Sequence, residues 1–257
     1  MKNIQVISLL ARGENAVQED ALLNHLDKGV FVLADGFGAG QVGAQAGKFA
    51  VESISSFLVR NSGDIDATLP FVLRRYFSLS GNMAFNALIH ANRELIARNR
   101  KVSFSEAGGA SAVAALLDED FLAIASVGVC SARLFRAGNA PVLLNRPRSY
   151  QQLRNPTAQA GLDREGRARV DLPLMALGMH DHFEPEVFEV QIQKGDWVLF
   201  HSDGMTPHLL EQIHALISGV PSVSSTEADQ ELTKRVNAAV VEASVSDHLA
   251  ISLVRFS

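Results

Sequence analysis

The sequence contains little cysteine and no excess of basic residues. A single cysteine, Cys130, occurs among 257 residues, so the chain cannot form an internal disulfide and a reducing, cytoplasmic location is expected. Lysine and arginine together number 23 against 28 acidic residues. No basic block of the kind that holds nucleic-acid phosphates is present, and no nucleic-acid partner is expected.

Long apolar segments are also missing. No apolar run approaches the ~18 residues that a membrane helix needs, and the N-terminal segment lacks the long apolar region and cleavage site of a secretory signal. No membrane partner is therefore expected. What is present is an ordinary globular composition, 47% hydrophobic and 20% charged. No boundary divides the chain, so a single domain over residues 1–257 is expected.

Short runs of branched aliphatic residues predict the strands. The isolated runs are residues 4–10, 21–26, 30–34 and 249–256. Three hairpins are also expected: one joins 111–117 to 121–128, one turns at Gly138-Asn139, and one joins 188–193 to the strand beginning at Trp197 through Lys194-Gly195-Asp196. Residues 145–170, broken by prolines and arginines, are expected to form a surface excursion.

Apolar residues at three-to-four spacing predict two sequential pairs of helices. These are expected over 42–60, from the low seventies to the high nineties, over 208–218 and over 227–243. Tight turns between strands indicate a mainly antiparallel sheet, and paired helices disfavour a doubly wound parallel fold. We therefore predict an α+β domain in which stacked sheets are covered by helices on the outside.

Acidic residues occur where the expected strands meet loops. Asp35 and Asp203 end apolar strands, whereas Asp20, next to Glu19, and Asp247 precede strands. If one sheet edge gathers these carboxylates, their mutual repulsion requires a counter-cation. Oxygen ligands without histidine or cysteine favour a hard ion such as Mg²⁺ or Mn²⁺.

The Asp-Gly pairs at 35–36 and 203–204 have two interpretations. As ordinary turn signals, the commoner use of Asp-Gly, they carry no chemistry. As parts of a site, the aspartate supplies a carboxylate and the glycine allows a sharp turn that leaves its carbonyl facing a ligand. Because both pairs close apolar strands, the second interpretation gains weight without excluding the first.

Five segments of the chain resemble, in order, those of the metal-dependent serine/threonine protein phosphatases, the protein phosphatase type 2C or PPM family, in its short bacterial form. The segments are ARGENAVQEDALL, VLADGFGAGQVGAQAG, GGASAVAALL, GDWVLFHSDGMT and SDHLAISLV. Each segment alone is weak, but five in order at plausible spacing are specific. The resemblance implies an α/β/β/α sandwich of two mainly antiparallel sheets flanked by paired helices.

The resemblance also implies a centre of two Mn²⁺ or Mg²⁺ ions at one end of this sandwich. Asp35 is implied to bridge the two ions. Asp203 and Asp247 are implied to hold one ion, and Glu19 with the carbonyl of Gly36 the other, partly through water.

Two catalytic roles are implied in the same way. Arg12 grips the substrate phosphate, and Asp20 orients a water that the ions activate. The implied reaction is hydrolysis of phosphoserine and phosphothreonine in proteins, within a cognate serine/threonine kinase pathway. No covalent phosphoenzyme is needed, so Cys130, in an apolar strand, is expected to be an inert core thiol.

The chain departs from the family pattern at several positions. Val129 stands where the family's Val-Gly-Asp-Ser-Arg segment places an aspartate that helps to hold a third ion, so a third ion is in doubt. The family's Leu-Thr-x-Asp-His segment is missing, and residues 152–161 stand near its place. His248 replaces the usual asparagine beside Asp247.

Two histidine-containing segments have competing interpretations. His201, directly before Ser202-Asp203, is either a group that orients a metal ligand or an ordinary core histidine. The histidines of the segment MHDH, residues 179–182, cannot share a helical face, although they could share a strand face and hold a metal ion. A solvated loop is expected instead, because loops tolerate polar residues freely.

Three functions are compatible with these observations. The first is an active phosphatase on phosphorylated proteins. The second is a degenerate relative that binds a phosphoprotein or partner without efficient hydrolysis, which Val129 favours. The third is a two-metal hydrolase of a small phosphoester, because a fold does not determine its substrate.

Overall fold

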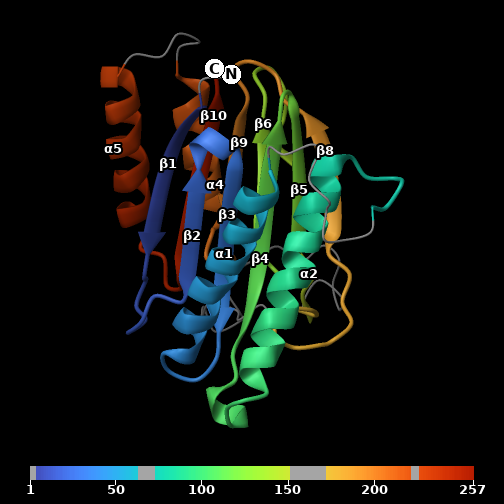
Figure 1. Ribbon diagram of the computed structural model, residues 1–257. Coiled ribbons are helices and arrows are strands. Elements are labelled where there is room, and N and C mark those ends of the chain that lie inside the picture. The colour runs from blue at the N-terminus through green and yellow to red at the C-terminus, as the bar shows by residue number, and fades with distance from the viewer. Residues whose placement is uncertain (1–3, 63–72, 151–171, 221–225) are drawn as a thin grey trace.

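Two antiparallel five-stranded sheets lie face to face at the centre of the structure (Figure 1). The computed structural model describes residues 4–62, 73–150, 172–220 and 226–257. The first sheet has the order β1-β10-β9-β6-β7, with bounds Ile4–Ala11, Leu249–Phe256, Trp197–His201, Ser131–Phe135 and Val142–Leu143. The second has the order β2-β3-β4-β5-β8, with bounds Asp20–His25, Val30–Phe37, Gly109–Asp118, Phe121–Val127 and Glu186–Gln191.

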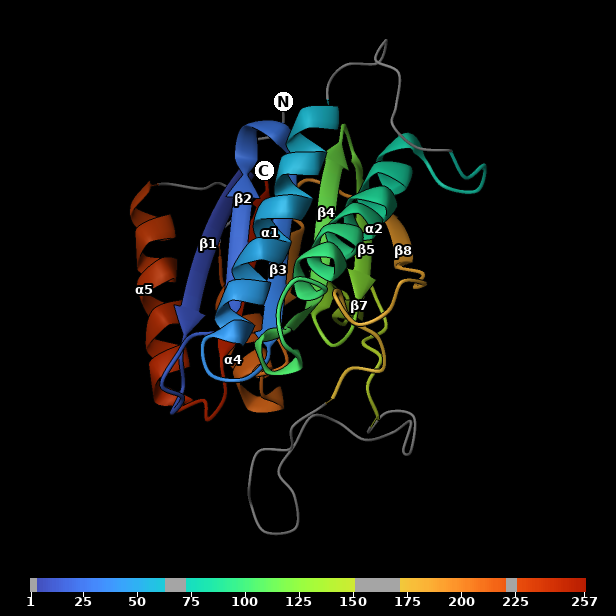
Figure 2. The same ribbon diagram turned by 60° about the horizontal axis from the view of Figure 1, so that its bottom comes forward.

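Helices cover the outer face of each sheet in sequential pairs. The helices are α1 (Val42–Asn61), α2 (Leu79–Asn99), α4 (Pro207–Ser218) and α5 (Thr226–Glu242). Figure 2 shows α1 and α2 lying across the second sheet, and α4 and α5 pack on the first sheet. None of the described helices is long and apolar enough to cross a membrane.

Aromatic side chains join the two sheets in the middle of the sandwich. Phe31 of β3 stacks on Phe200 of β9 with 6.0 Å between ring centroids, and meets Phe256 of β10 edge-on at 6.5 Å. All three rings are buried, and burying a side chain of this kind contributes about 1.5–3 kcal/mol. The core between the sheets thereby fixes β3, β9 and β10 relative to one another.

The predicted layers are confirmed, with two antiparallel sheets inside and paired helices outside. The 111–117/121–128 hairpin is present as β4 and β5, and the chain turns after Gly138, where the amide of Asn139 donates to the carbonyl of Arg136 at 3.0 Å. The strands predicted to begin at residues 4, 21, 30, 197 and 249 all begin within one residue of these positions, as β1, β2, β3, β9 and β10, because each is a run of aliphatic residues that is clear in the sequence.

The second helix begins later than predicted. Residues 73–78 are described and are not helical, and α2 starts at Leu79. Ser78 caps the helix by accepting a hydrogen bond from the amide of Gly81 at 3.0 Å. The side chain of Asn82 binds both the amide and the carbonyl of Arg74, at 2.6 and 3.0 Å. These polar side chains fix a non-helical approach to the helix.

The prediction that Lys194-Gly195-Asp196 closes a hairpin is wrong. The turn is tight, and Gly195 has a φ of 90°, but β8 pairs with β5 whereas β9 pairs with β6 and β10. The chain therefore crosses from one sheet to the other at this turn. The physical reason is burial: β8 is a half-exposed edge strand, and β9 is buried on both faces.

The predicted surface excursion at 145–170 is wrong at its first residues. Asn145 is buried, donates to the carbonyl of Cys130 at 2.9 Å and accepts from the amide of Ala132 at 2.8 Å. Ser149 is also buried. Residues 151–170 of the excursion, which include the segment 152–161, lie outside the described residues.

Candidate metal centre and active site

Asp20 and Asp35 lie side by side because the β2–β3 hairpin pairs them directly. Asp20 begins β2, and Asp35 lies near the end of β3. Directly opposed residues in an antiparallel pair have Cβ atoms about 4.5–5.5 Å apart on the same face. Asp20 is only 4% exposed. One end of the second sheet thus presents two adjacent carboxyl groups, one of them deeply buried.

Asp203 and Asp247 occupy the matching end of the first sheet. Asp203 follows β9 and Asp247 precedes β10, and these strands are antiparallel neighbours. Gly204 lies so close to the carbonyl oxygen of His248 that a Cβ atom there would clash. The glycine of this Asp-Gly pair is therefore needed for close packing of the two loops, as well as for the turn.

The hydroxyl group of Ser202 joins the two sheets at this end. It donates to Asp20 Oδ2 at 2.6 Å and accepts from the amide of Ala250 at 2.9 Å. Because Ser202 directly precedes Asp203, the hydrogen bond ties the end of β9 to the start of β2.

The four aspartates lie within electrostatic reach of one another. Burial raises the pKa of Asp35 well above its usual range, and the charges of Asp203, Asp20 and Asp247 raise it further. Burial also raises the pKa of Asp20 to about 7, against the lowering effect of the hydrogen bond from Ser202. Carboxylates influence one another in this way only at close range.

Glu19 lies against the first turns of α1. Its carboxylate fills the space that a Cβ atom of Gly43 would need, and its carbonyl oxygen would clash with a Cβ atom of Gly47. The amide of Gly36 donates to that same carbonyl at 3.2 Å. Burial raises the pKa of Glu19, and nearby His248 lowers it. The glycines of α1 thus allow Glu19 to sit between the helix and the sheet.

His248 and Asn15 fasten the loop that carries Asp247. His248 Nδ1 lies 3.4 Å from Asp247 Oδ1 and 4.0 Å from Glu19 Oε2. The other ring nitrogen, Nε2, lies 2.5 Å from the carbonyl oxygen of Val17. Asn15 Nδ2 donates to Asp247 Oδ1 at 3.1 Å. The loop before β2 is therefore held against the loop before β10.

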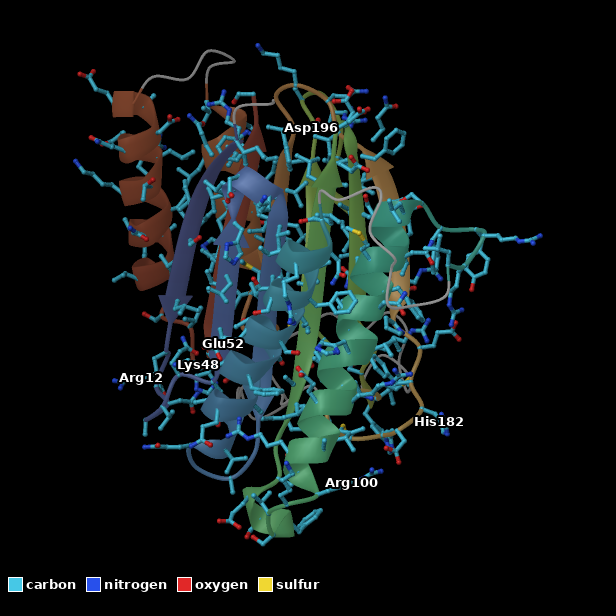
Figure 3. All side chains as sticks on the ribbon, in the orientation of Figure 1. Arg12, Lys48, Glu52, Arg100, His182 and Asp196 are labelled. Carbon is cyan, nitrogen blue, oxygen red and sulfur yellow. The ribbon has the colours of Figure 1, made fainter. Side chains whose placement is uncertain are left out.

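Arg12 is exposed at this same end of the molecule, far from Asp196 at the other end (Figure 3). Its Nη1 donates to the carbonyl of Ala16 at 3.1 Å. The adjacent Gly13, with a φ of 62°, packs on the backbone of Asp247. The remaining guanidinium donors face outward, where an anion can reach them.

Glu19, Asp20, Asp35, Asp203 and Asp247, here named the carboxylate cluster, have the chemistry of a site for a hard divalent cation. All their donor atoms are oxygens, and buried Asp20 Oδ1 has no hydrogen-bond partner among the described residues. As the side chains stand, no three histidine, cysteine, aspartate or glutamate residues of the described part enclose an ion. An ion bound by several of these carboxylates at once therefore requires their side chains to adopt other rotamers.

Val129 and Cys130 lie in the turn between β5 and β6, and both are buried. Burial raises the pKa of the Cys130 thiol well above its usual range, and the charges of Asp35 and Asp20 raise it further. Cys130 is thus a neutral core thiol near the carboxylate cluster, as expected. Val129 has no atom that can bind a metal ion, so this turn adds no ligand to the cluster.

His201 is an ordinary buried histidine. Its ring is 5% exposed, and burial lowers its pKa to about 4. Arg133 Nε donates to His201 Nε2 at 3.4 Å, and His201 Nδ1 lies 2.8 Å from the carbonyl oxygen of Ser202. Along β9 it alternates with Phe200, which faces the other sheet, so His201 faces the helices. The interpretation as a core histidine is the one that the structure supports.

The MHDH segment is exposed, as expected. His182 points outward on the surface in Figure 3. Asp181 forms an ion pair with Arg100, with Nη2 2.8 Å from Oδ1. Nothing in this loop approaches a metal-binding arrangement within the described residues.

Sequence reasoning missed the contributions of Ser202 and Asn15. Ser202 directly precedes Asp203, and Asn15 lies between Arg12 and Glu19 in the segment GENAVQED, so closeness in sequence to predicted site residues was the available signal. Their partners, Asp20 and Asp247, are distant in sequence. One hydrogen bond crosses between the two sheets and the other joins two loops, so both depend on tertiary packing that no local sequence pattern reveals.

No protein-family model and no curated protein matches the chain. Solved structures do match it over almost its whole length. One is the Mycobacterium tuberculosis serine/threonine phosphatase PstP/Ppp, with 18% identity, a TM-score of 0.70 and 100% of each chain covered. Another is the catalytic domain of PstP in complex with two manganese ions, with 19% identity, a TM-score of 0.69 and 99% of each chain covered.

A third is the PPM Ser-Thr phosphatase MsPP from Mycobacterium smegmatis in complex with cacodylate. It shares 19% identity and a TM-score of 0.70, with 98% of each chain covered. The chain therefore has the fold of the bacterial PPM-type serine/threonine phosphatases.

Proposed function

We propose that this chain is a single-domain, metal-dependent phosphatase that hydrolyses phosphoserine and phosphothreonine in proteins. The observation that carries the proposal is the convergence of four aspartates from two different sheets. The charges of Asp203, Asp20 and Asp247 all act on Asp35. Without a bound cation, this repulsion between carboxylates destabilises the fold. The two manganese ions of the matching PstP structure support the same interpretation.

Each residue has a role that its position supports. Asp35, Asp203, Asp247, Glu19 and the carbonyl of Gly36 would hold two divalent ions, with Asp35 contributing to both. When bound, two divalent ions lower the pKa of a water molecule and neutralise charge that develops on phosphorus.

The remaining groups bind the phosphate and place the water. The outward donors of Arg12 bind two oxygens of the phosphate monoester. Asp20 would accept a hydrogen bond from the attacking water and so orient it. Ser202 fixes the carboxylate of Asp20 through its 2.6 Å hydrogen bond. The thiol of Cys130, neutral and buried, takes no part.

A second candidate is a degenerate phosphatase that binds a phosphoprotein without efficient hydrolysis. The observation in its favour is Val129, which is buried in the turn between β5 and β6, at the position where the family pattern places an acid. A small phosphoester is the remaining alternative substrate. Exposed Arg12 recognises only the phosphate group, so it does not distinguish these substrates.

The deciding experiment is hydrolysis of a generic aryl phosphate by the purified chain with Mn²⁺, Mg²⁺ or chelator. We expect turnover with Mn²⁺ that stops with chelator, because the proposed reaction needs divalent ions to lower the pKa of the attacking water. Asp35→Asn should remove turnover. The matched control is Asp27→Asn, at the exposed opposite end of the same hairpin, which should retain it.

Absence of turnover at every Mn²⁺ concentration, with retained binding of phosphopeptides, would favour the non-hydrolysing candidate. A panel of phosphopeptides against small phosphoesters then separates the two substrate classes. A preference for small phosphoesters would contradict the protein-phosphatase proposal while leaving the metal chemistry intact.

A further inference from the structure

A cavity of about 560 Å³ opens at the end of the sandwich opposite the carboxylate cluster. It lies between the turn after β6, the turn before β9 and the C-terminal half of α4. The five-residue strand β9 begins at this cavity and ends two residues before Asp203. At ~3.3 Å per residue the strand is roughly 17 Å long, so the cavity and the carboxylate cluster are separated by about that distance. Figure 3 shows Asp196, a lining residue, far from Arg12. The cavity is therefore distinct from the proposed active site.

Positive charge exceeds negative charge around this cavity. The lining contains the cations Arg136, Lys194 and Arg255 and one carboxylate, Asp196. Asp229, outside the lining, offsets part of the Arg255 charge, with Nη1 3.8 Å from Oδ1. The surplus of between one and two charges is notable in a chain whose net charge is -5.

The guanidinium of Arg136 is held in place for a ligand. Its Nε and Nη2 donate to the two carboxylate oxygens of Asp196 at 2.9 and 2.6 Å, and Nη2 also donates to the carbonyl of Gln191 at 2.9 Å. Asp196 is buried, whereas the Arg136 side chain is 29% exposed. Nη1 makes no hydrogen bond to any described residue, so an anion meets a fixed donor at little entropic cost.

Lys194 supplies a second, unshared charge beside Arg136. It is exposed in the tight turn before Asp196, and it forms no ion pair within residues 4–62, 73–150, 172–220 and 226–257. One flexible ammonium and one fixed guanidinium on neighbouring turns form the kind of pair that holds a phosphate group.

Apolar and aromatic side chains form the inner wall. Trp197, Phe135 and Ile217 line the cavity together with His214, whose ring lies 5.3 Å from that of Phe135. A cavity of this size suits a small organic molecule. Its charged rim and apolar wall suit a ligand with both kinds of surface.

We infer that this cavity binds a small organic phosphate, with the phosphate at Arg136 and Lys194 and its apolar part against Trp197 and Ile217. A phosphate monoester carries between one and two negative charges near neutral pH, which matches the surplus of positive charge. A singly charged carboxylate leaves part of that surplus uncompensated.

The single tryptophan of the chain reports on this site directly. We would titrate the metal-free full chain, in chelator, with the phosphate monoester AMP as probe and follow the fluorescence of Trp197, with calorimetry as a second measurement. We expect saturable binding of AMP. Lys194→Glu should weaken it about tenfold or more, because it replaces a charge-assisted contact by repulsion. Inorganic phosphate, which has a similar charge but lacks an apolar part, should bind at least about tenfold more weakly than AMP.

The matched control is Lys234→Glu, an equal charge change at an exposed position of α5 outside the cavity lining. It should leave the AMP affinity within about twofold of the wild type, since a distant surface charge is screened. Three results would overturn the inference: no binding of AMP at millimolar concentration, equal weakening by both variants, or equal affinity for phosphate and AMP. Because no metal or turnover is involved, these results do not depend on the proposed function.

Discussion

Asp20 combines deep burial, a buried oxygen without a hydrogen-bond partner among the described residues, and three acidic neighbours. Burial is the largest cause of its raised pKa, and the hydrogen bond from Ser202 is the main influence that lowers the pKa. In the metal-free protein the group therefore binds a proton that the unfolded chain releases at about pH 4. This difference makes the stability of the fold depend on pH.

The first prediction concerns the sign of that dependence. The folded pKa of Asp20 is about 7 and lies above the unfolded value, so its stabilising contribution is complete below about pH 4 and is lost as pH rises to about 7. The free energy of unfolding of the wild type minus that of Asp20→Asn should fall by about 2 kcal/mol between pH 5.5 and 8. Urea denaturation in chelator measures both values.

The comparison with Asp20→Asn removes the influence of His201. The lowered pKa of that buried ring acts in the opposite direction, because its stabilising contribution is lost as pH falls from about 6.5 to about 4. Both proteins contain His201, so its contribution cancels in the difference. A difference that stays constant with pH would show that Asp20 is ionised throughout.

Single residues also mark the limit of what sequence patterns predict. Asp35 and Asp203 are visible as acids that end apolar strands, because strand ends are visible in sequence. The bond between Ser202 and Asp20 is not visible, because it crosses from one sheet to the other. His201 was ambiguous in sequence because its direction depends on which face of β9 is covered by helices.

At the scale of elements, α1 approaches the second sheet unusually closely through its glycines. A Cβ atom at Gly36 would clash with the carbonyl oxygen of Gly43, and one at Gly47 would clash with the carbonyl oxygen of Glu19. These contacts are between backbones, so no side-chain rotation relieves them. Because α1 contacts the backbone at Glu19 and at Gly36, which follows Asp35, the position of the helix constrains both acidic residues.

The second prediction is that Gly47→Ala destabilises the protein. Replacing a helical glycine by alanine usually stabilises by about 0.5–1 kcal/mol, but here the clash should reverse the sign and cost about 2 kcal/mol or more. The Mn²⁺ affinity should also fall, because the backbone of Glu19 contacts Gly47 and is displaced when the helix shifts. Thermal unfolding and Mn²⁺ titration measure the two effects.

Gly219→Ala is the matched control. Gly219 ends α4 with a φ of −86°, and a Cβ atom there would meet its nearest neighbours at ordinary distances, 3.7 and 3.9 Å. It should be neutral or stabilising by up to about 1 kcal/mol. If Gly47→Ala behaves like Gly219→Ala, the close approach of α1 is not required.

Element types were predictable from the sequence, whereas their pairing was less so. The start of α2 was missed because the caps of Ser78 and Asn82 outweigh the apolar periodicity before Leu79. The turn at Gly195 was recognised, but a tight turn does not say whether the next strand joins the same sheet. Only the contrast between exposed β8 and buried β9 indicates the crossing.

At the scale of the whole molecule, the carboxylate cluster stands across the boundary between the two sheets. Asp20 and Asp35 come from the β2–β3 hairpin, and Asp203 and Asp247 from the ends of β9 and β10. Besides the aromatic core, the described bonds across this boundary include Asn24 Nδ2 to Ser252 Oγ at 3.0 Å. An ion bound by both pairs of aspartates would therefore connect the sheets.

The last prediction follows from this position. Mn²⁺ at about 100 times its dissociation constant should stabilise the wild type by about 2.7 kcal/mol, a rise in Tm of roughly 5–10 °C for a chain of this size. Asp35→Asn, in one sheet, and Asp203→Asn, in the other, should each remove most of that rise, whereas Asp27→Asn should keep it.

Without metal the same substitutions should act in the opposite direction. Asp35→Asn removes a buried carboxyl group whose pKa is raised by burial and by three neighbouring charges, so its Tm in chelator at pH 8 should exceed that of the wild type. A Mn²⁺-dependent rise that survives in Asp203→Asn would show that one sheet alone holds the ion. The combination of a more stable metal-free fold and a lost metal response is expected only if the four carboxylates are gathered for a cation that joins both sheets.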